Sequence, residues 1–214
     1  MMRIDRAFQK SAAVSAVFAI AGSGLAAAQP VTEKWSGPPP VGARWESAQK
    51  NTGSFGTDRQ VRMTRLPDTT WKGAPALAIS NVGAGTLLMR PDDGHWMAAL
   101  GPDGAPAVTY DPPMGWLFPL AVGKKFDMNS RMTNAKGTVT DVSASCAIEA
   151  WEKVEVPAGS FDAYRIACKN NLGEEGVYWT SPDVGSFVRT RLQRSASHPA
   201  GAGTQESELV VSPR

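Results

Sequence analysis

Turn-forming residues recur along most of this chain at short intervals, and this spacing constrains the fold more than any other feature of the sequence. The segments between the turns are short and rich in β-branched and aromatic residues, as strands are. The pattern predicts an all-β fold, an antiparallel meander of roughly ten strands that forms a barrel, a half-barrel or a sandwich. The turn sites are residues 67–68, 81–85, 91–94, 101–104, 111–113, 134–137, 157–159 and 181–183.

The clearest part of the meander covers residues 86–110. Residues 86–90, 95–100 and 106–110 read as strands, separated by the turns Pro-Asp-Asp-Gly and Gly-Pro-Asp-Gly. Two tight turns leave no room for a crossover connection, so these three strands are predicted to be antiparallel neighbours.

The N-terminus carries the features of a secretory signal peptide. Arg3, Arg6 and Lys10 precede an apolar run at residues 12–21, and Ala26-Ala27-Ala28 forms a small-residue cleavage pattern. A membrane anchor is the alternative, but it needs about 20 predominantly apolar residues, and this run is shorter. We therefore expect residues 1–28 to be a signal peptide, cleaved before Gln29, and the protein to be periplasmic or secreted.

The remaining chain reads as one domain. Residues 29–41 include Gly37-Pro38-Pro39-Pro40 and are predicted to be an extended leading segment, followed by a single β-rich domain over residues 42–214. The full chain has 22 basic and 20 acidic residues, and the chain from Gln29 onward has 19 of each. A nearly neutral protein without a basic face is not expected to bind nucleic acid, and no later stretch is long enough for a membrane span.

Cys146 and Cys168 are the only two cysteines. In an oxidising compartment an isolated pair at moderate spacing predicts a disulfide. Two free buried thiols are the alternative. A metal site is not expected, because only His95 and His198 could assist and neither has the spacing of a ligand.

Residues 147–154 fit two kinds of secondary structure. They contain good helix formers, and Ile148, Trp151 and Val154 would share one helical face. Alternation through the flanking valines favours a long strand instead. The turn at residues 157–160 would then fold the next strand back and bring Cys168 opposite Cys146, or one register step away. On the chain-entropy model a bridge closing a loop of this length stabilises the fold by about 3 kcal/mol.

Three stretches of the second half carry recognisable motifs. Residues 154–161 read V-x-V-P-A-G-[ST]-F, residues 178–185 read Y-W-x-S-P-x-V-G, and Phe118-Pro119-Leu120 is followed by Val122-Gly123-Lys124. From Tyr110 onward the chain thereby resembles a broad group of uncharacterised exported bacterial proteins. The resemblance implies a β-rich envelope domain without an assigned activity, and it transfers no catalytic residues.

The sequence contains no recognisable catalytic constellation, and no cofactor is expected. No serine lies in a G-x-S-x-G elbow, and a histidine-dependent nucleophile has only two histidines to draw on. Asp92 and Asp93 lie in a turn, where such residues more often bond the turn backbone. Glu152 lies on the apolar phase of its strand, and a bulge that turns it outward is the favoured explanation.

Two groups of residues are candidates for ligand binding. Trp116, Leu117 and Phe118 form an apolar group in a connection, where they could rim a cavity or plug the end of a barrel. Arg189 and Arg191 share one face of a strand and could bind an anionic group. Pairing with Glu206 and Glu208 in the following strand is the simpler interpretation.

These observations favour a non-catalytic domain that binds an apolar or amphiphilic ligand, such as a lipid, or a cell-envelope protein. A carboxylate-dependent hydrolase using Glu152, Asp92 and Asp93 is one alternative, and a purely structural interaction module is the other.

Overall fold

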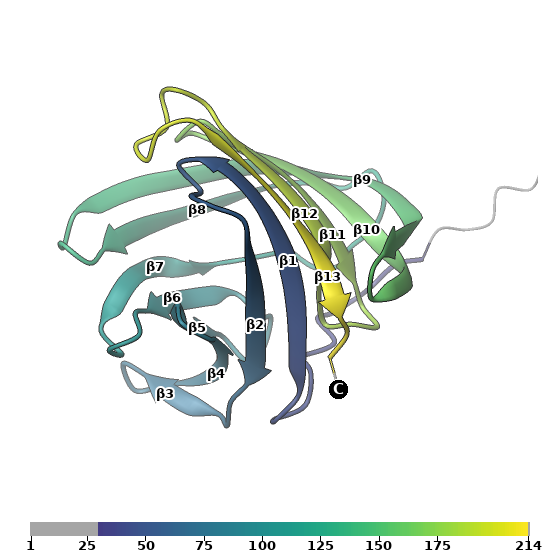
Figure 1. The fold of residues 1–214 in the computed structure, drawn as a ribbon, viewed down its shortest axis with the longest axis horizontal. Helices are drawn as coiled ribbons and strands as arrows, with labels where there is room; N and C mark the ends of the chain where they lie inside the picture. Colours follow the sequence, from purple (N-terminus) through teal and green to yellow (C-terminus); the bar gives the residue numbers. More distant parts are fainter. Residues whose placement is uncertain (1–29, 214) are drawn as a thin grey trace, which may run out of the picture.

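The computed structural model describes residues 30–213, so the predicted signal peptide and its cleavage site lie outside the described residues. Thirteen strands make up the fold (Figure 1). Their bounds are β1 Arg44–Gly53, β2 Arg59–Arg65, β3 Thr69–Trp71, β4 Ala74–Asn81, β5 Gly85–Met89, β6 Trp96–Leu100, β7 Pro106–Met114, β8 Lys125–Asn134, β9 Val139–Val156, β10 Gly159–Asn170, β11 Glu174–Ser181, β12 Ser186–Arg194 and β13 Gly203–Val211.

All the strands belong to one antiparallel sheet that closes on itself. Its order is β2-β1-β13-β12-β11-β10-β9-β8-β7-β6-β5-β4-β3, and β2 also pairs with β4. Twelve strands therefore form a closed barrel, and the three-residue strand β3 extends beside β4. The all-β antiparallel prediction is confirmed, and among the three predicted architectures the chain adopts the barrel.

The predicted meander is present as β5, β6 and β7, which pair in sequence order. The long-strand interpretation of residues 147–154 is also correct, because they lie within β9. Among residues 30–213 there is no helix long and apolar enough to cross a membrane.

A bulge in β9 changes which face each side chain occupies. Ile148 pairs with Ile166 and Ala150 with Arg165, so Glu149 is an extra residue. Trp151 then pairs with Tyr164 and shares a face with Ile148. The single apolar phase expected along this strand is therefore wrong beyond the bulge, where Val154 lies on the opposite face from Cys146.

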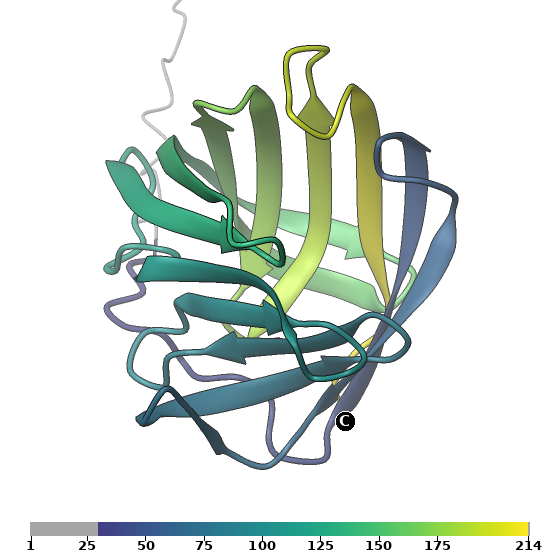
Figure 2. The same cartoon turned by 90° about the vertical axis from the view of Figure 1, so that its left-hand side faces the viewer.

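We call the face that carries Cys146 the disulfide face. From β7 to β13 it lines the barrel interior, where Tyr110 of β7 lies near Tyr178 of β11. In Figure 2 the teal strands β7 and β8 lie in front of β11–β13, across this interior. One cluster on this face is fully buried at Ile148, Tyr164 and Ile166. Burial on this scale contributes about 1.5–3 kcal/mol for each large apolar side chain.

A second buried cluster unites the two motifs at residues 154–161 and 178–185. Val154 and Phe161 of the β9–β10 hairpin pack with Trp179 and Val184 around the end of β11. Gly185 has a φ of 65°, and a Cβ on it would lie 2.8 Å from the carbonyl oxygen of Gly37. Glycine is required here by both conformation and space, which gives the end of the second motif a structural reason.

The leading segment crosses the same end of the barrel. Thr32 forms a two-way backbone bridge with Leu120, and the Tyr164 hydroxyl donates to the Pro30 carbonyl at 2.8 Å. The Ser36 hydroxyl donates to the Pro182 carbonyl at 3.2 Å. The segment therefore joins the β7–β8 connection to the β11–β12 turn.

Candidate binding groove

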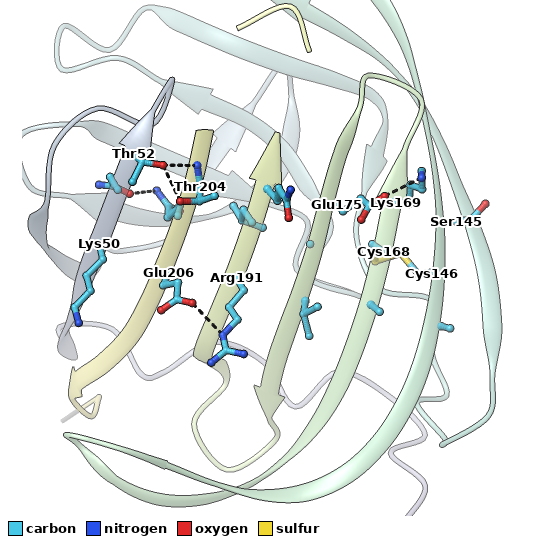
Figure 3. A pocket seen from close by; sticks show the side chains of 18 of the residues that line it. Lys50, Thr52, Ser145, Cys146, Cys168, Lys169, Glu175, Arg191, Thr204 and Glu206 are labelled. Atoms are coloured by element: carbon cyan, nitrogen blue, oxygen red, sulfur yellow. Dashed lines mark hydrogen bonds and ion pairs between the residues drawn. A yellow bond between two sulfur atoms is a disulfide. The ribbon is translucent and has the colours of Figure 1, made fainter. Parts of the chain in front are cut away.

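An open groove of about 1230 Å³ extends across seven strands, and its floor is the sheet face opposite the disulfide face (Figure 3). Alternate residues of a strand point to opposite faces, so the strand register identifies the floor side chains. Two parallel cross-strand rows of side chains form the floor. One row is polar and consists of Asp127, Ser145, Lys169, Glu175, Gln193, Thr204 and Thr52. The other row has an apolar middle, and we call it the floor row. Its members are Lys125, Ala147, Ala167, Val177, Arg191, Glu206 and Lys50.

The middle of the floor row consists of small apolar side chains. Ala147, Ala167 and Val177 lie on β9, β10 and β11 and are each partly exposed. They are flanked by the longer side chains of Lys125 and Arg191. The groove is therefore hollow at its centre and bounded by charged groups.

Two ion pairs hold half of the eight charged side chains that line the groove. Lys169 contacts Glu175 at 2.8 Å, and this carboxylate raises the pKa of Lys169 by accepting its hydrogen bond. Arg191 contacts Glu206 at 3.3 Å. Within the part of the chain that the structure describes, Lys50 and Lys125 form no ion pair, so each end of the floor row carries an uncompensated positive charge.

The far part of the β9–β10 hairpin crosses the same face of the sheet beside the groove. The indole N–H of Trp179 donates to Glu152 Oε1 at 2.7 Å, and Arg189 Nη2 donates to the Glu155 carbonyl at 2.7 Å. The backbone N–H of Ala158 reaches the Leu209 carbonyl of β13 at 3.1 Å. The hairpin thus crosses the ends of β11 and β12 and forms a wall.

The disulfide lies directly beneath the centre of the floor. Cys146 and Cys168 are bonded, as predicted, with their Cα atoms 4.1 Å apart. They are register partners on β9 and β10, one residue before Ala147 and one after Ala167. A covalent link between these strands restrains the sheet beneath the floor of the groove.

The structure places the two arginines predicted to bind a ligand in different surroundings. Arg191 lines the groove, whereas Arg189 pairs with Glu208 at 2.8 Å beneath the hairpin. The cross-strand pairs with Glu206 and Glu208, offered as the simpler interpretation, are therefore both present.

The apolar connection lies on the other side of the sheet. Trp116 makes edge-to-face contacts with Phe126, Tyr178 and Phe187, and so packs into the barrel interior. Phe118 packs against the buried cluster of the disulfide face, and Leu117 is 39% exposed. None of these three residues reaches the groove.

The three candidate acids do not converge on one site. Asp93 bonds Arg90 and the backbone N–H of His95 in the β5–β6 turn, and Glu152 belongs to the hairpin wall. His95 is buried, and its Nε2 lies 3.0 Å from the Trp116 carbonyl. Residues 30–213 contain no cluster of three or more metal-ligating side chains. The hydrolase alternative gains no support from this geometry.

The sequence did not reveal the groove, because its residues occupy ordinary alternate positions of predicted strands. Only the register brings Ala147, Ala167 and Val177 side by side, and they come from three segments of the chain. Small residues on the outward phase of successive strands were the one available signal.

No family model matches this chain, and no curated protein matches it. Among solved structures it is similar to a candidate lipoprotein of Parabacteroides distasonis, with 14% identity and a TM-score of 0.47 over 85% of this chain and 99% of the other. It is also similar to a candidate exported protein of Bacteroides fragilis with a YmcC-like fold, at 15% identity and a TM-score of 0.46, over 86% and 100% of the two chains. For the hypothetical lipoprotein YmcC of Escherichia coli K12 the values are 6% and 0.42, over 79% and 84%.

Proposed function

We propose that this protein is a non-catalytic, exported domain that binds an elongated amphiphilic ligand in the groove. The observation that carries the proposal is the floor row, which has small apolar side chains in its middle and, at each end, a lysine without an ion-pair partner among residues 30–213. Six spacings between seven strands give it a length of about 29 Å along the curved sheet. A compact ligand would leave most of this row uncovered.

The chemistry of the groove favours a ligand with an apolar chain and an anionic group. Ala147, Ala167 and Val177 offer apolar contact without hydrogen-bonding groups. Lys125 and Lys50 offer ammonium groups that lack a carboxylate partner within residues 30–213. Lys169 and Arg191 are each paired with a glutamate, and Asp58 and Asp127 accept hydrogen bonds from Asn51 and Ser145, so an anion bound at either lysine displaces no ion pair of the groove.

Export is the second part of the proposal. It is supported by the N-terminal signal pattern and by the disulfide, which forms and persists in oxidising compartments. A ligand of this chemistry and a location in the periplasm or outside the cell are compatible, because amphiphiles need a protein carrier to cross water.

Calorimetric titration with dodecanoate tests the groove. Replacing Ala167 with Trp fills the centre of the floor, and we expect the affinity to fall by about tenfold or more, which corresponds to about 1.4 kcal/mol. The matched control is Ala107→Trp, because Ala107 is an exposed strand residue of β7 outside the groove. Lys125→Gln should weaken dodecanoate binding but leave binding of uncharged dodecanol unchanged.

Two results would contradict the proposal. One is a wild-type protein that does not bind dodecanoate. The other is an Ala167→Trp variant that remains folded by circular dichroism and binds dodecanoate as tightly as the Ala107→Trp control.

A further inference from the structure

The strands β7 and β8 pair over only part of their length. Residues Val108 to Asp111 pair with Asn134 to Arg131, and there the pairing ends. The Ser130 hydroxyl donates to the Pro112 carbonyl at 2.7 Å, where the two strands separate. In Figure 1, β7 and β8 diverge from this point. Among residues 30–213, no strand pairs with residues 125–130 on this side of β8.

The register identifies which backbone groups this edge leaves free. A pair of opposite residues with Cα atoms 4.1 Å apart, such as Cys146 and Cys168, is a non-hydrogen-bonded pair. The N–H and C=O of Cys146 therefore point toward β8, where its partner is Phe126. The backbone groups of Phe126 point back to β9, and those of Lys125, Asp127 and Asn129 point to the open side.

Two further observations agree with this assignment. Arg131 follows Asn129 by two residues, so its backbone groups should point to the same side of β8. Arg131 is the partner of Asp111 on β7, which lies on that side. Lys125, Asp127 and Asn129 are all exposed, whereas Phe126 and Ser130 are buried. A hollow of about 470 Å³, lined in part by Pro112, Asn129 and Arg131, leaves space at the point of separation.

We propose that this open edge, residues 125–129, pairs with the same edge of a second copy of the chain. The two β8 strands would run antiparallel about a two-fold axis at Phe126. Each Lys125 would then form a hydrogen-bonded pair with Asp127 of the partner subunit, giving four backbone hydrogen bonds in a continuous sheet.

Charge complementarity identifies the occupant as a second copy. In this register each Lys125 ammonium lies opposite the partner's Asp127 carboxylate, on the same face of the joined sheet. Lys125 has no carboxylate partner within residues 30–213, and Asp127 accepts a hydrogen bond from the Ser145 hydroxyl at 2.7 Å. A two-fold axis at Asp127 instead would oppose two carboxylates. Charges on an edge normally discourage pairing, but here the two signs alternate so that the edge complements itself.

The proposed dimer interface adjoins the groove, because Lys125 and Asp127 line the end of the groove at β8. The two grooves would meet there and continue across the dimer. In the dimer Lys125 would pair with the partner's Asp127, so the anionic group of a ligand would bind at Lys50, whereas both lysines are available in the monomer. The pairing does not depend on the proposed ligand, since it follows from the backbone edge and the two charges alone.

Sedimentation equilibrium of the chain from Gln29 onward tests the dimer. The interface is small, so we expect a weak, reversible dimer that forms in the micromolar to millimolar range. Lys125→Asp opposes two pairs of carboxylates, and Asp127→Lys opposes two pairs of ammonium groups. Each variant alone should be monomeric. Lys136→Asp is the control, because Lys136 is exposed in the β8–β9 turn and lies outside the paired edge.

Mixing the two monomeric variants gives the sharpest result. A Lys125→Asp chain and an Asp127→Lys chain are complementary at both positions, so the mixture should associate, as should the double variant that exchanges the two residues. Asp127→Pro removes both the outward N–H and the carboxylate, and it should also abolish association. A wild-type monomer at millimolar concentration, single variants that dimerise like the control, or a mixture that stays monomeric would each overturn the proposal.

Discussion

The Asp93 carboxylate lies in the turn between β5 and β6, surrounded by groups that favour its charged form. Arg90 donates to it through Nε at 2.9 Å, and the His95 backbone N–H donates at 3.1 Å. The His95 ring donates its Nε2 proton to the Trp116 carbonyl, so Nδ1 is left to accept from Arg90. A turn that reads as generic in sequence thus anchors the β7–β8 connection.

This arrangement makes stability depend on pH. Burial alone would raise the pKa of Asp93, but the hydrogen bonds and positive charge of Arg90 and the His95 N–H lower it below its ordinary value. The stabilisation is complete above the unfolded pKa of about 3.9 and is lost as pH falls through the lower folded value. We expect Asp93→Asn to lower Tm by about 2–4 °C at pH 7, and thermal melts should show this difference shrinking toward pH 2. A difference that is constant with pH would contradict the assignment.

Trp179 and Glu152 permit a second test at single-residue scale. The indole N–H donates to Glu152 at 2.7 Å, and the Glu152 side chain is 37% exposed and also faces Arg165 at 3.9 Å. Hydrogen bonds to charged groups contribute about 1.5–3 kcal/mol, and solvent screening reduces this one to about 1 kcal/mol. A double-mutant cycle of Trp179→Phe with Glu152→Ala, measured by urea unfolding, should give a coupling free energy of that size. A coupling near zero would show that the hairpin wall is held by apolar packing alone.

At the scale of elements, the β9–β10 hairpin contributes to both large buried clusters of the barrel. The hairpin is long enough to pack in two different clusters. The bulge at Glu149 reverses which face of β9 each alternate side chain occupies, so buried side chains lie on opposite faces before and after it. Before the bulge the buried residues line the disulfide face. Beyond it Val154 is buried against Trp179 and Val188 instead. One extra residue therefore lets a single hairpin face the barrel interior at one end and pack over β11 and β12 at the other.

The disulfide belongs to this hairpin and should stabilise it. Replacing both Cys146 and Cys168 with Ala should lower the free energy of unfolding by about 2–5 kcal/mol, the usual range for a native bridge. The barrel should nevertheless remain folded, because its buried clusters are large enough to hold it together. Urea unfolding with circular dichroism measures the loss. Two titratable thiols in the unreduced, denatured wild-type protein would contradict the bridge.

At the scale of the whole molecule, closure joins segments that are far apart in the chain. Strand β1 pairs with β13, and β2 pairs with β4 to close the barrel. The leading segment then crosses from Leu120 to Pro182 and covers one end. The described chain is organised as one barrel, one end of which is covered by connections and by the segment that begins at Pro30.

The predicted signal peptide belongs to this scale as well. We expect the exported protein to begin at Gln29 or within two residues of it, because the small-residue cleavage pattern ends at Ala28. Intact-mass measurement of protein recovered from the cell envelope or the medium checks this. A mass that includes residues 1–28 would show that the N-terminus is retained as an anchor.

The amino-acid sequence by itself determined the strands, most of the turns, and the pairing of the two cysteines. These features depend on alternation, on proline, glycine and aspartate at turns, and on a hairpin that brings Cys168 back to Cys146, all of which are local. The strand count was underestimated because elements such as β3 are too short to show a period.

Only the tertiary structure decided the closure of the barrel, the exchange of faces at Glu149 and the positions of the candidate site residues. Each depends on register and twist accumulated over many strands, and a shift of one residue moves a side chain to the opposite face. Trp116 consequently lies inside against Tyr178, whereas Ala167 forms the floor of a groove. Local pattern specified the strands of this protein, and the sum of their pairings placed its candidate site.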